Sequence, residues 1–166
     1  EEMVASATGS KGAVATSSGT TGIHAALTAV GVGRDDLVII PTFTFIATAN
    51  AVRHCGADPW LMDVRYDDWC LDPDEVQREI DSNCALKPEG LYHTGTGRRV
   101  ASIMPVYTLG NIPDMQKFRA IADEYKLPLI VDAACAIGAT YHGEPFGGLA
   151  DLSIISFNGN KTITCG

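Results

Sequence analysis

Apolar runs alternate with amphipathic segments along this sequence, which predicts buried strands that alternate with surface helices. Leu37–Ile40 is a short, β-branched run that ends at Pro41, a pattern typical of a buried strand. Residues 20–30 carry apolar side chains at helical spacing, and Ser17-Ser18-Gly19 before them is a turn and capping signal. We therefore expect a helix that begins close to Gly19.

The same alternation continues to residue 157. Further helices are predicted at residues 45–54, 73–80 and 114–125, and further strands at residues 60–64, 101–106, 129–131 and 152–157. The polar segment 82–99 is expected to form a loop or a hairpin. Short strands that alternate with helices indicate an α/β domain, with a mostly parallel central sheet flanked by helices.

Composition and charge exclude several classes of protein. The chain has 166 residues, 46% of them hydrophobic and 19% charged, which fits one globular domain with a sizeable core. The net charge is −8 and no stretch is rich in Lys and Arg, so we expect no nucleic-acid partner. No apolar run is long enough to cross a bilayer, so we expect no membrane segment.

The five cysteines are an odd number and include no Cys-x-x-Cys pair. Such cysteines are typical of reduced thiols in the cytoplasm, and not of a disulfide framework or a metal site. The sequence begins without Met and stops shortly after Lys161. We therefore expect it to be part of a longer protein.

Candidate functional residues gather at strand ends, which is where open parallel sheets bind their ligands. Ser18, Gly19 and Thr20 stand at a predicted helix start, where free N–H groups can bind an anion; an ordinary N-cap is the alternative. Asp132 ends a predicted strand, where its carboxylate can meet a protonated ring nitrogen. A cap for a helix at residues 133–134 and a magnesium ligand are the alternatives for Asp132.

Lys161 follows the predicted strand 152–157 in a loop that is rich in Gly and Asn. A lysine in this position can be partly desolvated, which favours the neutral amine that forms a Schiff base. A solvated surface lysine is the alternative.

Five blocks of the sequence resemble, in order, the sugar aminotransferases of the DegT/DnrJ/EryC1/StrS group, which are fold-type-I enzymes that use pyridoxal 5′-phosphate (PLP). These blocks are residues 17–52, 58–64 with 69–76, 105–115, 127–147 and 150–166. The resemblance implies that the chain is the large PLP-binding domain, with a smaller C-terminal domain outside it. It also implies a homodimer, with each active site built at the subunit interface.

Roles for single residues follow from this resemblance. Lys161 is expected to form the Schiff base with PLP, and Asp132 to pair with the pyridine nitrogen. Phe45 is expected to stack on the ring. The start of the helix at Ser18, Gly19 and Thr20, together with the hydroxyl of Ser156, is expected to hold the phosphate.

The sequence departs from the family pattern in two places. Members often have Gln, His or Glu at the position of Cys135, where the side chain contacts the phenolic oxygen of the cofactor, and a thiol does this poorly. Many have His-Leu-Tyr-Gly where this chain has residues 107–110, Tyr-Thr-Leu-Gly. A related dehydratase branch has His at the position of Lys161, so the lysine argues for transamination.

The implied reaction is a ping-pong transamination, in which L-glutamate donates its amino group and the 4-keto carbon of a nucleotide-linked 6-deoxy sugar receives it. The polar insert before Gly97-Arg98-Arg99 is similar to the subgroup that aminates UDP-linked 4-keto-6-deoxy-N-acetylhexosamines. Arg98 and Arg99 are candidates to face a nucleotide diphosphate, and solvated arginines beside a strand are the alternative.

Two other functions stay open at this point. One is a PLP enzyme of another reaction type, such as a lyase or a cysteine desulfurase. The other is a PLP fold kept as a non-catalytic regulatory module. We also expect the 166-residue piece alone to be inactive or nearly so, because the smaller domain and the contacts from a partner subunit lie outside it.

Overall fold

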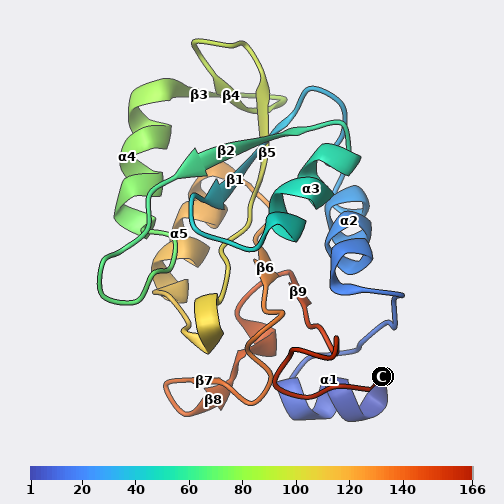
Figure 1. Cartoon of the computed structure of the whole chain (residues 1–166). Coiled ribbons are helices and arrows are strands. Elements are labelled where there is room, and N and C mark those ends of the chain that lie inside the picture. The colour runs from blue at the N-terminus through green and yellow to red at the C-terminus, as the bar shows by residue number, and fades with distance from the viewer. Residues whose placement is uncertain (166) are drawn as a thin grey trace.

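The computed structural model describes residues 1–165 and confirms an α/β fold with a mostly parallel sheet (Figure 1). Strand β1 (Leu37–Pro41) lies between β2 (Asp58–Met62) and β5 (Arg99–Ile103) and runs parallel to both. The apolar run that predicted β1 is buried along its whole length. This strand is therefore central in the sheet.

Two single bridges continue the sheet beyond β5. Ile103 pairs with Leu129, and Val106 pairs with Asp132. They join β5 to β6 (Ile130–Asp132), which pairs in parallel with β9 (Leu152–Ile154). The parallel strands therefore follow the order β2-β1-β5-β6-β9, and their carboxyl ends share one edge.

The polar segment that was expected to form a loop or a hairpin is a hairpin. Strand β3 (Cys84–Lys87) pairs antiparallel with β4 (Gly90–His93), and β4 pairs antiparallel with the start of β5. A small second hairpin, β7 (Thr140–Tyr141) with β8 (Glu144–Pro145), was not predicted.

Two helices lie on each side of the sheet (Figure 1). Helices α2 (Gly19–Ala29) and α3 (Ile46–His54) lie on one side, and α4 (Pro73–Asn83) and α5 (Met115–Tyr125) on the other. All four were predicted from the sequence, although α4 extends three residues beyond the predicted 73–80. The sequence also did not predict α1 (Glu2–Thr8) and two 3₁₀ turns, η1 (Thr108–Gly110) and η2 (Phe146–Gly148).

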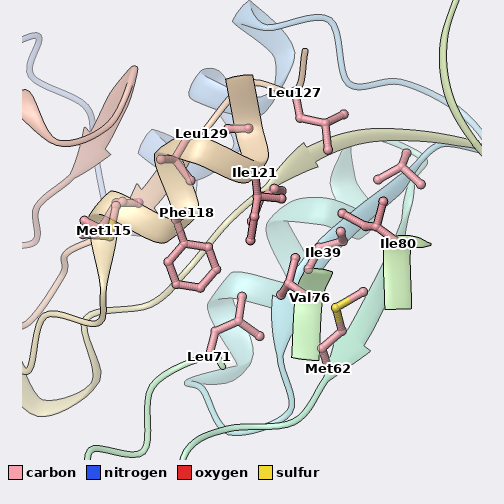
Figure 2. Close-up of a cluster of buried hydrophobic side chains, with 14 of the residues drawn as sticks. Ile39, Met62, Leu71, Val76, Ile80, Met115, Phe118, Ile121, Leu127 and Leu129 are labelled. Carbon is pink, nitrogen blue, oxygen red and sulfur yellow. The ribbon is translucent and has the colours of Figure 1, made fainter. Parts of the chain in front are cut away.

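The core has two layers because successive side chains of a strand point to opposite faces. Leu37 and Ile39 pack in the cluster that contains the buried side chains of α4 and α5, including Phe118 (Figure 2). Val38 and Ile40 pack in the cluster that contains the buried side chains of α2 and α3. Helices that cover both faces leave the strand ends as the accessible part of the sheet. Within residues 1–165, no helix is long and apolar enough to span a bilayer.

Candidate functional site

Asp132 is a buried acid at the carboxyl end of β6, and its carboxylate accepts two hydrogen bonds. The residue is 5% exposed. Its Oδ2 accepts a hydrogen bond from the hydroxyl of Thr48 at 2.7 Å, and its Oδ1 accepts one from the backbone N–H of Ala134 at 3.1 Å. Burial raises the pKa of Asp132, whereas these two donors and the charge of Lys161 oppose the rise.

The two alternative roles of Asp132 are not supported. A turn follows Asp132, not a helix, so its interpretation as a helix cap is wrong, although the carboxylate does accept the N–H of Ala134. Among the residues that the structure describes, no three His, Cys, Asp or Glu side chains gather to hold a metal ion.

Thr48 is the residue of this site that sequence reasoning missed. It stands in the first turn of α3, is fully buried, and lies 84 residues from Asp132 along the chain. Thr44 is within hydrogen-bond distance of it, with 2.8 Å between the two hydroxyl oxygens. The only local signal was a pair of hydroxyl residues four positions apart at a predicted helix start, and that pattern is typical of ordinary capping as well.

The start of α2 lies against the end of β9. A Cβ added to Gly19 would be 3.4 Å from the Cβ and 3.6 Å from the Oγ of Ser156. Ser18 is the N-cap, and its Oγ accepts the N–H of Thr21 at 3.2 Å, so the predicted cap is confirmed. The first N–H groups of a helix have no partner inside it, so those of Gly19 and Thr20 are left to bind an anion beside the hydroxyl of Ser156.

Lys161 extends from the loop after β9 toward Cys135 and Phe45. Its Nζ donates a hydrogen bond to Cys135 Sγ at 3.3 Å and lies 5.8 Å from the centroid of the Phe45 ring. Phe45 is the N-cap of α3 and is 71% exposed, so its aromatic ring is largely open to solvent beside the amine. The loop therefore brings an amine, a thiol and an aromatic ring together.

These groups fit PLP, the cofactor that the sequence resemblance implies. The helix start at Gly19 and Thr20 suits a phosphate, and the carboxylate of Asp132 suits a protonated ring nitrogen. Strands β6 and β9 are parallel neighbours, and the amine of Lys161 contacts Cys135 three residues after Asp132, so the amine and the carboxylate lie at the same edge of the sheet. The strand order thus gathers four separate segments of the chain into one candidate site, namely residues 18–20, 44–48, 132–135 and 156–161.

Arg98 and Arg99 lie at the amino end of β5, which is the opposite edge of the sheet from Asp132. Arg98 pairs with Asp58 at 2.7 Å, and Arg99 donates to Asp36 Oδ1 at 2.9 Å. Both guanidinium groups are therefore held in ion pairs away from the candidate site, and they are also more closely paired than the solvated arginines of the alternative.

The sequence matches the model of the DegT/DnrJ/EryC1/StrS aminotransferase family over residues 1–166. It is 42% identical over 166 residues to the GDP-perosamine synthase of Caulobacter vibrioides, an alignment that covers 100% of this chain and 40% of that protein. The chain therefore spans about 40% of the length of this curated relative.

Two solved structures share the fold. NtdA from Bacillus subtilis, with bound cofactor PMP, has a TM-score of 0.75 and 37% identity, over 91% of this chain and 30% of its own. DesI, in the presence of its TDP-sugar product, has a TM-score of 0.83 and 34% identity, over 99% of this chain and 37% of its own. The fold and the family that the sequence predicted are thus confirmed.

The raised pKa of Asp132 predicts that its charge destabilises the cofactor-free protein. Ionisation of Asp132 is less favourable in the folded state than in the unfolded state. The resulting loss of stability is complete above the pKa of Asp132 in the folded protein, and it disappears as the pH falls below its pKa in the unfolded protein. Asp132→Asn should therefore raise the free energy of unfolding at pH 7, by on the order of 1 kcal/mol, and the gain should shrink in acid. Urea unfolding at several pH values measures this.

Asp151→Asn is the matched control, with the opposite sign. The Arg119 guanidinium that hydrogen-bonds Asp151 lowers the pKa of that carboxyl, so this variant should lose stability at pH 7 and recover it in acid. An Asp132→Asn protein that is less stable than the wild type at pH 7 contradicts our interpretation of the buried acid.

Proposed function

Because this chain belongs to the DegT/DnrJ/EryC1/StrS aminotransferase family, we propose that it is the large, cofactor-binding domain of a PLP-dependent sugar aminotransferase. The observation that carries the proposal is that the amine of Lys161 contacts Cys135 and lies beside Phe45, in the loop that follows the strand next to the one ending at Asp132. A smaller domain, as the family resemblance implies, completes the enzyme in this proposal.

Each residue of the candidate site has a distinct task in the proposed reaction. Bound PLP supplies an electron sink for the carbon that loses its proton. The Nζ of Lys161 would hold the cofactor covalently and, while not bonded to it, would move the proton between the two reacting carbons. The carboxylate of Asp132 keeps the ring nitrogen protonated, and the open face of Phe45 supports the ring.

Phosphate binding and the contact of Cys135 complete the proposal. The N–H groups of Gly19 and Thr20 and the hydroxyl of Ser156 hold the phosphate through the start of α2, which Ser18 caps. Cys135 stands where the family often has a stronger hydrogen-bonding side chain, and its thiol already contacts the lysine amine. We propose that it lies against the phenolic oxygen of the cofactor and bonds it weakly.

The proposed substrates are a nucleotide-linked 4-keto-6-deoxy sugar and L-glutamate, which donates the amino group. The names of the relatives support the sugar, since one is a GDP-perosamine synthase and another was solved with its TDP-sugar product. The proposed compartment is the cytoplasm, which is consistent with five free cysteines in the structure.

Reduction with borohydride tests the cofactor assignment. In the PLP-loaded protein, borohydride should fix the cofactor covalently on Lys161, and digestion with mass spectrometry should find the label on that residue. Lys161→Arg should abolish the label and lower transamination by at least about 10³-fold, because the covalent step is lost. Lys87→Arg, a change at an exposed lysine of the β3–β4 hairpin, should leave both unchanged. A label on another lysine refutes the assignment.

A second assay tests the substrate. We expect the enzyme to aminate a GDP-linked 4-keto-6-deoxy sugar with glutamate, with kcat/KM at least about tenfold above that for a UDP-linked 4-keto-6-deoxy-N-acetylhexosamine, since a tenfold preference needs only about 1.4 kcal/mol of differential binding. A reversed preference favours the UDP-sugar subgroup that the sequence resembles. Release of alanine or sulfide without amination of either sugar contradicts the proposed reaction.

The proposed homodimer is supported by large apolar side chains that are exposed next to the site. Phe43, Ile46 and Trp69 are 44%, 62% and 52% exposed, and the rings of Phe43 and Trp69 lie 5.0 Å apart. Exposed groups of this kind often mark contact surfaces. Sedimentation should give the mass of two chains, and Phe43→Glu should shift the protein toward monomer. Leu86→Glu, an equally exposed position in β3, should leave the dimer intact. A wild-type monomer at micromolar concentration overturns the dimer.

A further inference from the structure

Two threonines extend the site behind Asp132, and neither has a role in the function proposed above. Thr48 is fully buried and donates its hydroxyl proton to Asp132 Oδ2 across 2.7 Å. Thr44 lies one turn earlier, half-buried, with its Oγ1 2.8 Å from that of Thr48. A buried carboxylate is therefore connected through two hydroxyls to the surface.

The direction of these hydrogen bonds follows from the number of protons. A threonine hydroxyl has one proton to donate. An ionised carboxylate has none, so the short contact requires Thr48 to give its proton to Asp132. The Thr48 oxygen can then only accept from Thr44, whose own proton must point inward. The three side chains thus form a directed chain from Thr44 through Thr48 to Asp132.

These two hydrogen bonds favour the ionised form of Asp132 and fix the orientation of its carboxylate. The backbone N–H of Ala134 occupies Oδ1 and the Thr48 hydroxyl occupies Oδ2, so the carboxylate cannot rotate without losing a donor. A carboxylate has about four lone-pair positions, so Asp132 can still accept a hydrogen bond from a further donor. Thr48 also stands in the first turn of α3, where the positive end of the helix dipole favours a nearby negative charge.

We propose that Thr48 is a positioning residue for the cofactor, which holds the carboxylate of Asp132 ionised and aimed at the ring nitrogen, and that Thr44 orients Thr48. The inference rests on the proposed function, because it needs a cofactor with a basic ring nitrogen at Asp132. Thr48 itself contacts neither the ring nor the reacting atoms. Its effect passes through Asp132 alone.

The test compares PLP-loaded wild type with Thr48→Val, which keeps the shape of the side chain and removes its proton. The dissociation constant of PLP should rise about tenfold, since a hydrogen bond to a charged group has been lost. As the pH falls, the visible absorption band of the bound cofactor should be lost at a higher pH than in the wild type, because Asp132 becomes protonated more readily. Thr48→Ser, which restores a hydroxyl, should recover both values.

Thr8→Val is the matched control, since it removes another buried threonine hydroxyl, one that bonds to Val4 in α1. It should leave the dissociation constant and the pH dependence of the band unchanged. Wild-type values in Thr48→Val overturn the proposal, and so does a Thr48→Ser protein that behaves like Thr48→Val. If Thr48→Val does not fold, Thr44→Val is tested in its place. An unchanged pH dependence of the absorption band in Thr44→Val then overturns the proposal.

Borohydride labelling separates this inference from the proposed function. Labelling of Lys161 in both the wild type and Thr48→Val, with unchanged spectra, rejects only the role of Thr48. Absence of the label in the wild type rejects the cofactor site itself, and the role of Thr48 with it.

Discussion

The burial of the Asp132 carboxylate at the carboxyl end of β6 is the constraint on which the rest of the site depends. An unpaired buried charge is costly, and one hydroxyl, one backbone N–H and the charge of Lys161 offset part of that cost at Asp132. Such a group is stabilised further when a cation binds beside it. In the proposed function, the protonated ring of the cofactor supplies this cation and stabilises the protein.

The parallel sheet explains how distant segments meet at this charge. Strands β6 and β9 are neighbours, so the loops that follow them bring Asp132 and Lys161 to one edge. Helix α2 begins against the end of β9, which places Gly19 beside Ser156. Helix α3 begins at the same edge and contributes Thr48. Helices on both faces leave this edge as the place where a ligand can enter.

The positions of Asp132 and Lys161 could be predicted from the sequence, because Asp132 ends one buried strand and Lys161 lies in the loop after another. The roles that we propose for them come from the family resemblance. The cap at Ser18 was also a local pattern. Thr48 could not be predicted, since its hydrogen bond spans 84 residues and depends on how α3 packs beside β6. The ion pair of Arg98 with Asp58 was not predictable either, because it depends on β2 lying on the far side of β1 from β5.

The protonation state of the ring nitrogen in the bound cofactor tests the central claim most directly. PLP that carries nitrogen-15 in its ring can be bound to the protein and observed by NMR. We predict the chemical shift of a protonated ring nitrogen at pH 7 in the wild type, and that of an unprotonated nitrogen in Asp132→Asn. An unprotonated nitrogen in the wild type, or the same shift in both proteins, would contradict the assignment of Asp132 as the partner of the ring.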